Sequence, residues 1–159
     1  MVFFGIELFD RSDWKKDVLV GVLIGAGFVV ANFLVPAIAI GMPSLSLSLG
    51  DLSRWLVIGL IAPVVEEILF RGALVGFLTN WKKMPLILAG VISAAAFTVY
   101  HLAAYGASLA VAGAYLGALI FGLLAFFITK WRNNLLPAII MHSIFNSYLL
   151  FKMVVVIGI

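Results

Sequence analysis

The sequence predicts an all-α protein: a polytopic membrane helix bundle of about five transmembrane helices, in a single integral membrane domain over residues 1–159. Hydrophobic residues make up 65% of the chain and charged residues 11%, where soluble domains carry about 25% charged residues. The mean hydropathy is +1.24. Apolar segments recur at the length of roughly 20 residues that one bilayer crossing needs. Since lipid offers no hydrogen bonds to the backbone, these segments are predicted to be helices.

The predicted spans follow one another with short connections. They cover about residues 18–41, 53–78, 84–105, 107–129 and 134–158. Between the first two lies "SLSLSLGD" at 44–51, which we interpret as an interfacial connection. Asp51 or Ser53 is predicted to cap the second helix, because short polar side chains satisfy the first backbone N–H groups of a helix.

Residues 1–17 mix acidic and aromatic side chains. A secretory signal would begin with basic residues and continue with an apolar run, whereas this segment carries Glu7, Asp10, Asp13 and Asp17. We therefore predict a cytoplasmic or interfacial segment and a retained first span.

Basic residues are distributed unevenly across the predicted spans. On one side lie Arg11, Lys15, Lys16, Lys82, Lys83, Lys130 and Arg132, and on the other Arg54 and Lys152. Because cytoplasmic loops carry the excess of Lys and Arg, this bias predicts a cell-membrane protein with a cytoplasmic N-terminus and an external C-terminus.

Composition also excludes several kinds of site. No run of basic residues indicates nucleic-acid binding. The absence of cysteine excludes disulfides, a cysteine nucleophile and thiolate metal ligands. The glycine pairs Gly21–Gly25 and Gly113–Gly117 favour close helix packing, within this bundle rather than in a dimer.

A few ionisable residues lie away from the ends of the predicted spans. The second span holds Glu66, Glu67 and Arg71, the third His101, and the fifth His142 with Asn146. A charge at the bilayer centre costs about 3 kcal/mol on insertion scales, so such residues usually mark a function.

Helical spacing sorts these residues. Glu67 and Arg71 are four residues apart with the acid first, which favours an ion pair. Glu66 points about 100° away around the helix and has no partner in its own span. Pro63 removes a backbone N–H one turn earlier, which would free a carbonyl and could admit water. Because a helix rises about 1.5 Å per residue, counting from the ends of the predicted spans places His142 nearer the cytoplasm than Glu66, and His101 nearer the outside.

Two kinds of chemistry fit these residue types. A carboxylate and a histidine converging on one water make a general base, while a second histidine beside an asparagine offers donors to an oxyanion. Alternatively, Glu66, His101 and His142 would form a zinc site with an open position. No H-E-x-x-H motif is present, and a metal-free base needs only Glu66 and one histidine, so we favour the reading without a cofactor.

Three motifs then resemble those of a known family. "EEILFR" has the form E-E-x-x-x-R, "FTVYH" has the form F-x-x-x-H, and "HSIFN" has the form H-x-x-x-N. In this order, on successive membrane helices, they resemble the CAAX protease and bacteriocin-processing family of intramembrane endopeptidases, which includes the eukaryotic Ras-converting prenyl protease. The resemblance covers about residues 52–150, the predicted catalytic core.

The resemblance implies roles for these residues. Glu66 and His101 would activate the attacking water, His142 and Asn146 would stabilise the oxyanion, and Glu67, held by Arg71, would support the site. The family has been described both as metalloproteases and as metal-free glutamate proteases. The implied substrate is a membrane-associated peptide or a lipidated, CaaX-type protein.

Two functions of other classes compete with proteolysis. A bacteriocin-immunity or scaffold protein would need the polar residues only for packing. A proton or ion carrier would use intramembrane Glu and His as a relay, although the sequence shows no paired repeat with interrupted helices.

Overall fold

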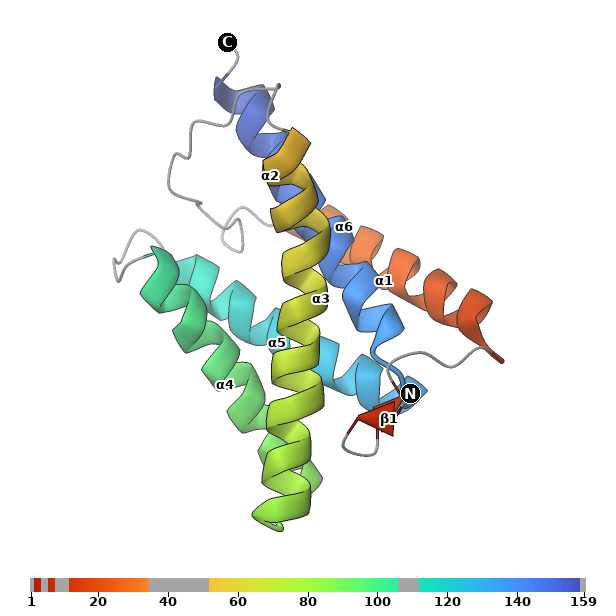
Figure 1. Ribbon diagram of the computed structural model, residues 1–159. Helices are drawn as coiled ribbons and strands as arrows, with labels where there is room; N and C mark the ends of the chain where they lie inside the picture. Colours follow the sequence, from red (N-terminus) through yellow and green to blue (C-terminus); the bar gives the residue numbers. More distant parts are fainter. Residues whose placement is uncertain (1, 4–5, 8–11, 35–51, 106–111, 158–159) are drawn as a thin grey trace.

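The chain folds into long helices that pack side by side (Figure 1). The computed structural model describes residues 2–3, 6–7, 12–34, 52–105 and 112–157. A short antiparallel hairpin, β1 (Val2–Phe3) and β2 (Ile6–Glu7), opens the chain. The main helices are α1 (Trp14–Leu34), α4 (Leu86–Tyr105), α5 (Ala112–Arg132) and α6 (Leu136–Ile157). The hairpin was not predicted.

A continuous helical rod over residues 52–81, the long helix, lies between the α4–α5 pair and the α1–α6 pair (Figure 1). It alternates between α and π geometry. Its segments are α2 (Leu52–Leu56), η2 (Val57–Ile61), α3 (Ala62–Glu67), η3 (Ile68–Leu74) and η4 (Phe77–Trp81). Pro63 does not break the rod, because it falls in the first turn of α3, directly after a π segment.

Consecutive helices run in opposite directions. In the long helix, Ile58 meets Asn146 and Glu67 meets His142, so the rod is antiparallel to α6. α4 and α5 are also antiparallel, because Gly90 of α4 approaches Phe126 of α5 and Ala94, further along α4, approaches Gly122, which comes earlier in α5. α1 is parallel to α6. This alternation is the arrangement that five successive crossings would require.

The helices agree with the predicted spans in position, and the all-α class is confirmed apart from the small hairpin. Within the described residues, two helices are long and apolar enough to cross a membrane: Leu86–Ala103 and Tyr115–Arg132. The apolar part of α6, Leu136–Phe151, is shorter. Five crossings therefore stay a prediction. The "SLSLSLGD" connection, Asp51 and the side chains of Arg54 and Lys152 lie outside what the structure describes.

α1 packs on α6 through two glycines. A Cβ on Gly21 would lie 2.7 Å from the carbonyl oxygen of Pro137 and 2.8 Å from Cβ of Ile140. A Cβ on Gly25 would lie 3.2 Å from Ile144. The missing side chains let the backbones approach closely, which confirms packing within the bundle for this pair. The surroundings of Gly113 lie outside the described side chains.

A buried polar cluster fixes the basic end of the same pair of helices. Asp17 is 1% exposed; it accepts hydrogen bonds from Nε of Arg132 at 2.6 Å and from Nδ2 of Asn134 at 2.7 Å. Asn134 in turn accepts the N–H of Leu136 at 3.0 Å and so caps α6. Nearby, the hydrogen bond from Lys16 lowers the pKa of the exposed Asp13 below its ordinary value.

Replacing Gly21 by alanine should destabilise the protein, because the new methyl group meets backbone that cannot move aside. Overpacking of this kind costs about 1–3 kcal/mol. The matched control is Gly27→Ala, since a Cβ there meets nothing within 4 Å and alanine gains up to about 1 kcal/mol over glycine in a helix.

Thermal unfolding of the two variants in detergent compares them directly. Gly21→Ala should unfold at a lower temperature than the parent, and Gly27→Ala at an equal or higher one. Equal unfolding temperatures for both variants would contradict the close α1–α6 contact.

Candidate functional site

Glu67 is the centre of a buried polar network. Its Oε1 accepts hydrogen bonds from Nη1 of Arg71 at 3.0 Å and from Nδ1 of His142 at 2.8 Å. The exposed fractions of the Glu67 and Arg71 side chains are both 0%. The predicted i,i+4 pair is therefore present, and it reaches across to α6 through a histidine.

Glu66 lies beside this network with a different environment. Its Oε2 is 3.7 Å from Nε2 of His142 and has no hydrogen-bond partner among the described residues. The Glu66 side chain is 13% exposed, against 3% for His142 and 0% for Glu67. Oε2 is itself buried, so the exposed part of this side chain lies on its other atoms. Glu66 is thus the more accessible acid of the pair, although the oxygen that faces His142 is covered.

His142 is oriented from both sides. When Nδ1 donates its proton to Glu67, Nε2 faces Glu66. In the neutral ring Nε2 is then an acceptor, and in the protonated ring it is a second donor. The Phe121 ring packs edge-on against the imidazole, with centroids 4.8 Å apart. The ring therefore has one fixed direction relative to both carboxylates.

Irregular helix geometry positions Arg71. It lies in the π segment η3, where the Phe70 carbonyl accepts both the N–H of Val75 and the hydroxyl of Ser93 at 2.7 Å. Nη2 of Arg71 donates to the carbonyl of Gly122 at 3.2 Å. Gly122 also lies against Ala94, with its missing Cβ only 3.1 Å from the Ala94 backbone. π segments occur often at functional sites.

One aromatic ring connects the parts of the site. The Phe97 ring lies under the Arg71 guanidinium at 4.5 Å, within the range of a cation–π contact. Its centroid is 4.3 Å from that of His101 and 5.7 Å from that of His142. Phe97 and His101, the two fixed residues of the F-x-x-x-H motif, are in contact, and the two imidazoles pack against the same phenyl ring.

His101 uses one nitrogen within its own helix. Its Nδ1 is 2.9 Å from the carbonyl oxygen of Phe97, so Nδ1 carries the proton in this bond and Nε2 is the acceptor in the neutral ring. The side chain is partly buried.

Asn146 holds the long helix against α6. Its Nδ2 donates to the carbonyl of Ile58 at 3.0 Å. In η2 the N–H of Ala62 donates to the carbonyl of Val57, five residues earlier. By the same spacing, the N–H that would donate to the Ile58 carbonyl belongs to position 63. Pro63 has none. The carbonyl that Pro63 was predicted to free is thus taken by Asn146, which still has a second amide proton.

In the part of the chain that the structure describes, no three His, Asp or Glu side chains form a group that could hold a metal ion. Nδ1 of His101 faces the Phe97 carbonyl and Nδ1 of His142 faces Glu67, and contacts of this kind also orient metal-binding histidines. The zinc set of Glu66, His101 and His142 therefore stays a prediction, and no step below uses it.

The site contains residues that the sequence motifs did not single out. Ser93 and Gly122 support η3 and Arg71, and Phe97 joins the guanidinium to both imidazoles. A signal existed only for Phe97, as the first letter of F-x-x-x-H. Ser93 and Gly122 resemble ordinary small residues of membrane helices, so nothing in their spacing identified them.

Comparison with known proteins gives one family. A family model described as Rce1-like, type II CAAX prenyl endopeptidase Rce1-like, matches residues 48–148. The match covers more than half of the chain, and it confirms the resemblance seen in the three motifs. No significant match to a curated protein or to a solved structure accompanies it.

Removing the charge of Arg71 should destabilise the protein strongly. Arg71→Met leaves the Glu67 carboxylate buried with only His142 beside it, and breaking a buried pair from one side costs about 3–5 kcal/mol. The double variant Glu67→Gln/Arg71→Met removes both charges and should recover part of the loss.

Denaturation of both variants and of Glu67→Gln measures the coupling between the two side chains. If the single and double variants were equally unstable, Arg71 would contribute through packing rather than through its charge.

Proposed function

We propose a function for a chain that belongs to the Rce1-like family of type II CAAX prenyl endopeptidases: it is an intramembrane endopeptidase that hydrolyses a peptide bond with water activated by Glu66. The observation that carries this proposal is the contrast between the two adjacent acids. Each acid has one buried oxygen without a partner, but Glu67 is fully buried and bound through its other oxygen by Arg71 and His142, while the Glu66 side chain is 13% exposed and its Oε2 lies 3.7 Å from His142.

In the proposed reaction, a water between Glu66 Oε2 and His142 Nε2 gives its proton to the carboxylate. The oxygen attacks the substrate carbonyl, and the C–N bond breaks as Glu66 returns the proton to the departing amine. Proton transfer by a positioned group contributes about 10²–10⁴-fold to a rate. The separation of 3.7 Å between these two atoms exceeds that of a direct hydrogen bond, so the proposed water would bind beside the pair as the side chains part.

His142 would stabilise the oxyanion when its Nε2 carries a proton. The imidazolium then lies between Glu66 and Glu67. The Arg71–Glu67 pair holds Nδ1, so Nε2 stays directed at the reaction centre. This is the orienting role that a buried carboxylate plays behind a catalytic histidine.

His101 and Asn146 are proposed to complete the site from opposite sides. His101 shares the Phe97 surface with His142, and with Nδ1 bound to the Phe97 carbonyl its Nε2 would accept a proton from water. Asn146 lies one turn beyond His142 on α6 and would offer its second amide proton to the oxyanion.

The substrate class follows from the family. A type II CAAX prenyl endopeptidase family implies a peptide or a prenylated protein, and the exposed apolar side chains along the helices suit a lipid-linked substrate that approaches within the bilayer. A small membrane-associated peptide without a lipid is the alternative substrate of the same chemistry.

The basic end of the bundle is proposed to face the cytoplasm. Lys16, Lys83, Lys130 and Arg132 lie where α1 and α4 begin and where the long helix and α5 end, and cytoplasmic ends carry such residues. Because the chain has no cysteine, single cysteines test this cleanly. Lys83→Cys should react with an impermeant maleimide only in inverted vesicles, and Ser53→Cys only in intact cells. The reverse pattern would invert the orientation.

Glu66→Gln should abolish cleavage of a farnesylated CaaX peptide by purified protein, with a loss of at least about 100-fold. The amide keeps the size of the side chain but cannot take the proton from water. The unfolding temperature should stay close to that of the parent, because Oε2 of this acid makes no hydrogen bond to another helix among the described residues.

Asp13→Asn is the matched control, since it makes the same carboxyl-to-amide change at an exposed position, and it should retain full activity. A parallel assay with 1,10-phenanthroline should also retain it. Full turnover by Glu66→Gln would end the catalytic assignment; loss of turnover with the chelator alone would favour a zinc-dependent reaction instead.

A further inference from the structure

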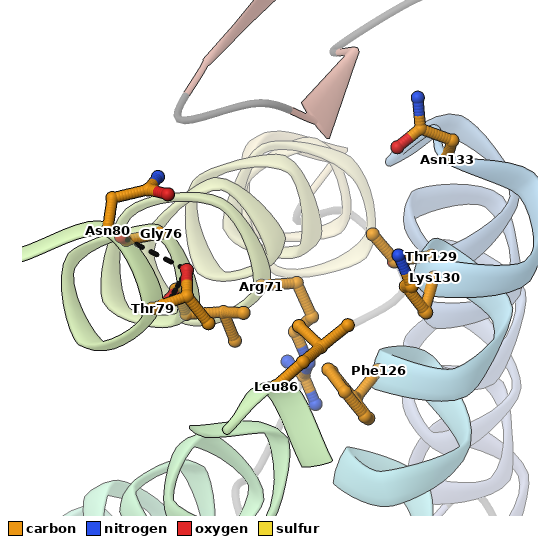
Figure 2. A pocket seen from close by; sticks show the side chains of 10 residues that line it. Arg71, Gly76, Thr79, Asn80, Leu86, Phe126, Thr129, Lys130 and Asn133 are labelled. Atoms are coloured by element: carbon orange, nitrogen blue, oxygen red, sulfur yellow. Dashed lines mark hydrogen bonds between the residues drawn. The ribbon is translucent and has the colours of Figure 1, made fainter. Parts of the chain in front are cut away.

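A second polar cavity lies at the basic end of the bundle, away from Glu66. It has a volume of about 220 Å³ and lies between the long helix, the start of α4 and the end of α5. The residues that line it are Arg71, Val75, Gly76, Thr79, Asn80, Leu86, Phe126, Thr129, Lys130 and Asn133. Figure 2 shows Arg71 reaching from the long helix toward Leu86 and Phe126, with Thr129 and Lys130 on α5.

The lining of this cavity carries positive charge and no acid. Arg71 forms its inner part and Lys130, which is exposed, its outer part. Neither Asp nor Glu is among the lining residues. Since the charge of Arg71 is shared with Glu67, Lys130 supplies the surplus positive charge.

Two buried polar atoms at the inner part have no partner. Arg71 and Thr129 are each 1% exposed, and neither Nε of Arg71 nor Oγ1 of Thr129 has a hydrogen-bond partner among the described residues. A buried polar group without a partner destabilises the folded state. Both atoms are themselves buried, so an occupant of the cavity would reach them only after their side chains turn toward it. Both can donate a hydrogen bond, which favours an acceptor, and the charge of the lining favours an anion.

The position of the cavity indicates the source of that anion. Trp14, Trp81 and Trp131 are exposed at the same end of the bundle, and tryptophan is enriched at the level of the lipid headgroups. Lys15 and Arg132 lie over two of these rings, at 5.8 and 5.7 Å. A basic pocket between membrane helices at this depth is a typical site for an anionic headgroup.

We infer that this cavity binds the phosphate of an anionic phospholipid, with Lys130 and Thr129 as its contacts and the Arg71 Nε–H at its inner end. The site is distinct from the water site beside Glu66. Arg71 belongs to both, since its Nη1 donates to Glu67, so the lipid would set the position of the guanidinium that supports the Glu67–His142 bond.

The inference is tested by thermal unfolding of the purified protein in a zwitterionic detergent, titrated with dihexanoyl-phosphatidylglycerol. A ligand that binds only the folded state raises the unfolding temperature with its concentration, which yields an apparent Kd. Dihexanoyl-phosphatidylcholine, whose headgroup has no net charge, should give a smaller shift. Inorganic phosphate, as a free anion, should give little shift at equal concentration.

Three variants test whether the phosphatidylglycerol binds in the cavity. Lys130→Gln should weaken the apparent affinity for the glycerol lipid about fivefold, and Thr129→Val should weaken it by several-fold through the lost hydroxyl. Lys83→Gln removes an exposed charge at the same end but outside the cavity, and should leave the affinity unchanged. None of these positions is part of the water site.

Each other outcome would overturn the inference. Equal weakening by Lys83→Gln and Lys130→Gln would indicate a diffuse basic surface. An equal shift with inorganic phosphate would make the site one for free phosphate. A shift caused by a CaaX peptide with a free C-terminal carboxylate, lost in Lys130→Gln while the lipid has no effect, would assign the cavity to the peptide. Activity toward the farnesylated peptide is measured separately, so failure of the lipid site and of the protease proposal stay distinguishable.

Discussion

The arrangement of the bundle depends on one buried ion pair. Glu67 and Arg71 are both fully excluded from solvent, and two charges removed from water are tolerated only with good geometry and additional hydrogen bonds. Those bonds come from other helices: His142 on α6 donates to Glu67, and the carbonyl of Gly122 on α5 accepts from Arg71. The pair therefore constrains where α5 and α6 lie relative to the long helix.

Backbone irregularity in the long helix supports that arrangement. A displaced carbonyl buried between helices needs a donor from within the protein. Asn146 takes the carbonyl of Ile58 that Pro63 leaves open, and Ser93 takes that of Phe70. Each of these bonds joins the long helix to a neighbour on either side of the acidic pair. The polar residues of α4 and α6 thus fasten the helix that carries Glu66 in both position and rotation.

Much of this could be predicted from the sequence, and the limits have physical reasons. The helices and the Glu67–Arg71 pair follow from apolar length and i,i+4 spacing, which are local properties. Spacing also showed that Glu66 faces away from Arg71, but it could not show which histidine meets it. Which histidine meets Glu66 depends on the depths of α4 and α6. Counting a rise of about 1.5 Å per residue from the predicted helix ends placed His101 and His142 on opposite sides of Glu66. In the structure His142 bonds Glu67 and faces Glu66 at 3.7 Å, while His101 joins the site through Phe97. The π segments and the unpartnered atoms of the basic-end cavity leave no trace in residue spacing at all.

In the proposed hydrolysis, the different environments of the two adjacent acids give each a separate role. A carboxylate that orients a histidine works best when it is dry and fixed, and one that accepts a proton from water must be wet on at least one side. A single glutamate cannot satisfy both conditions. Because consecutive helical positions point about 100° apart, Glu66 and Glu67 can occupy the two environments while sharing His142, whose two ring nitrogens face one acid each. The imidazole is therefore the element that couples the buried pair to the accessible carboxylate. Any influence on Arg71 from the basic-end cavity would reach Glu66 by the same route.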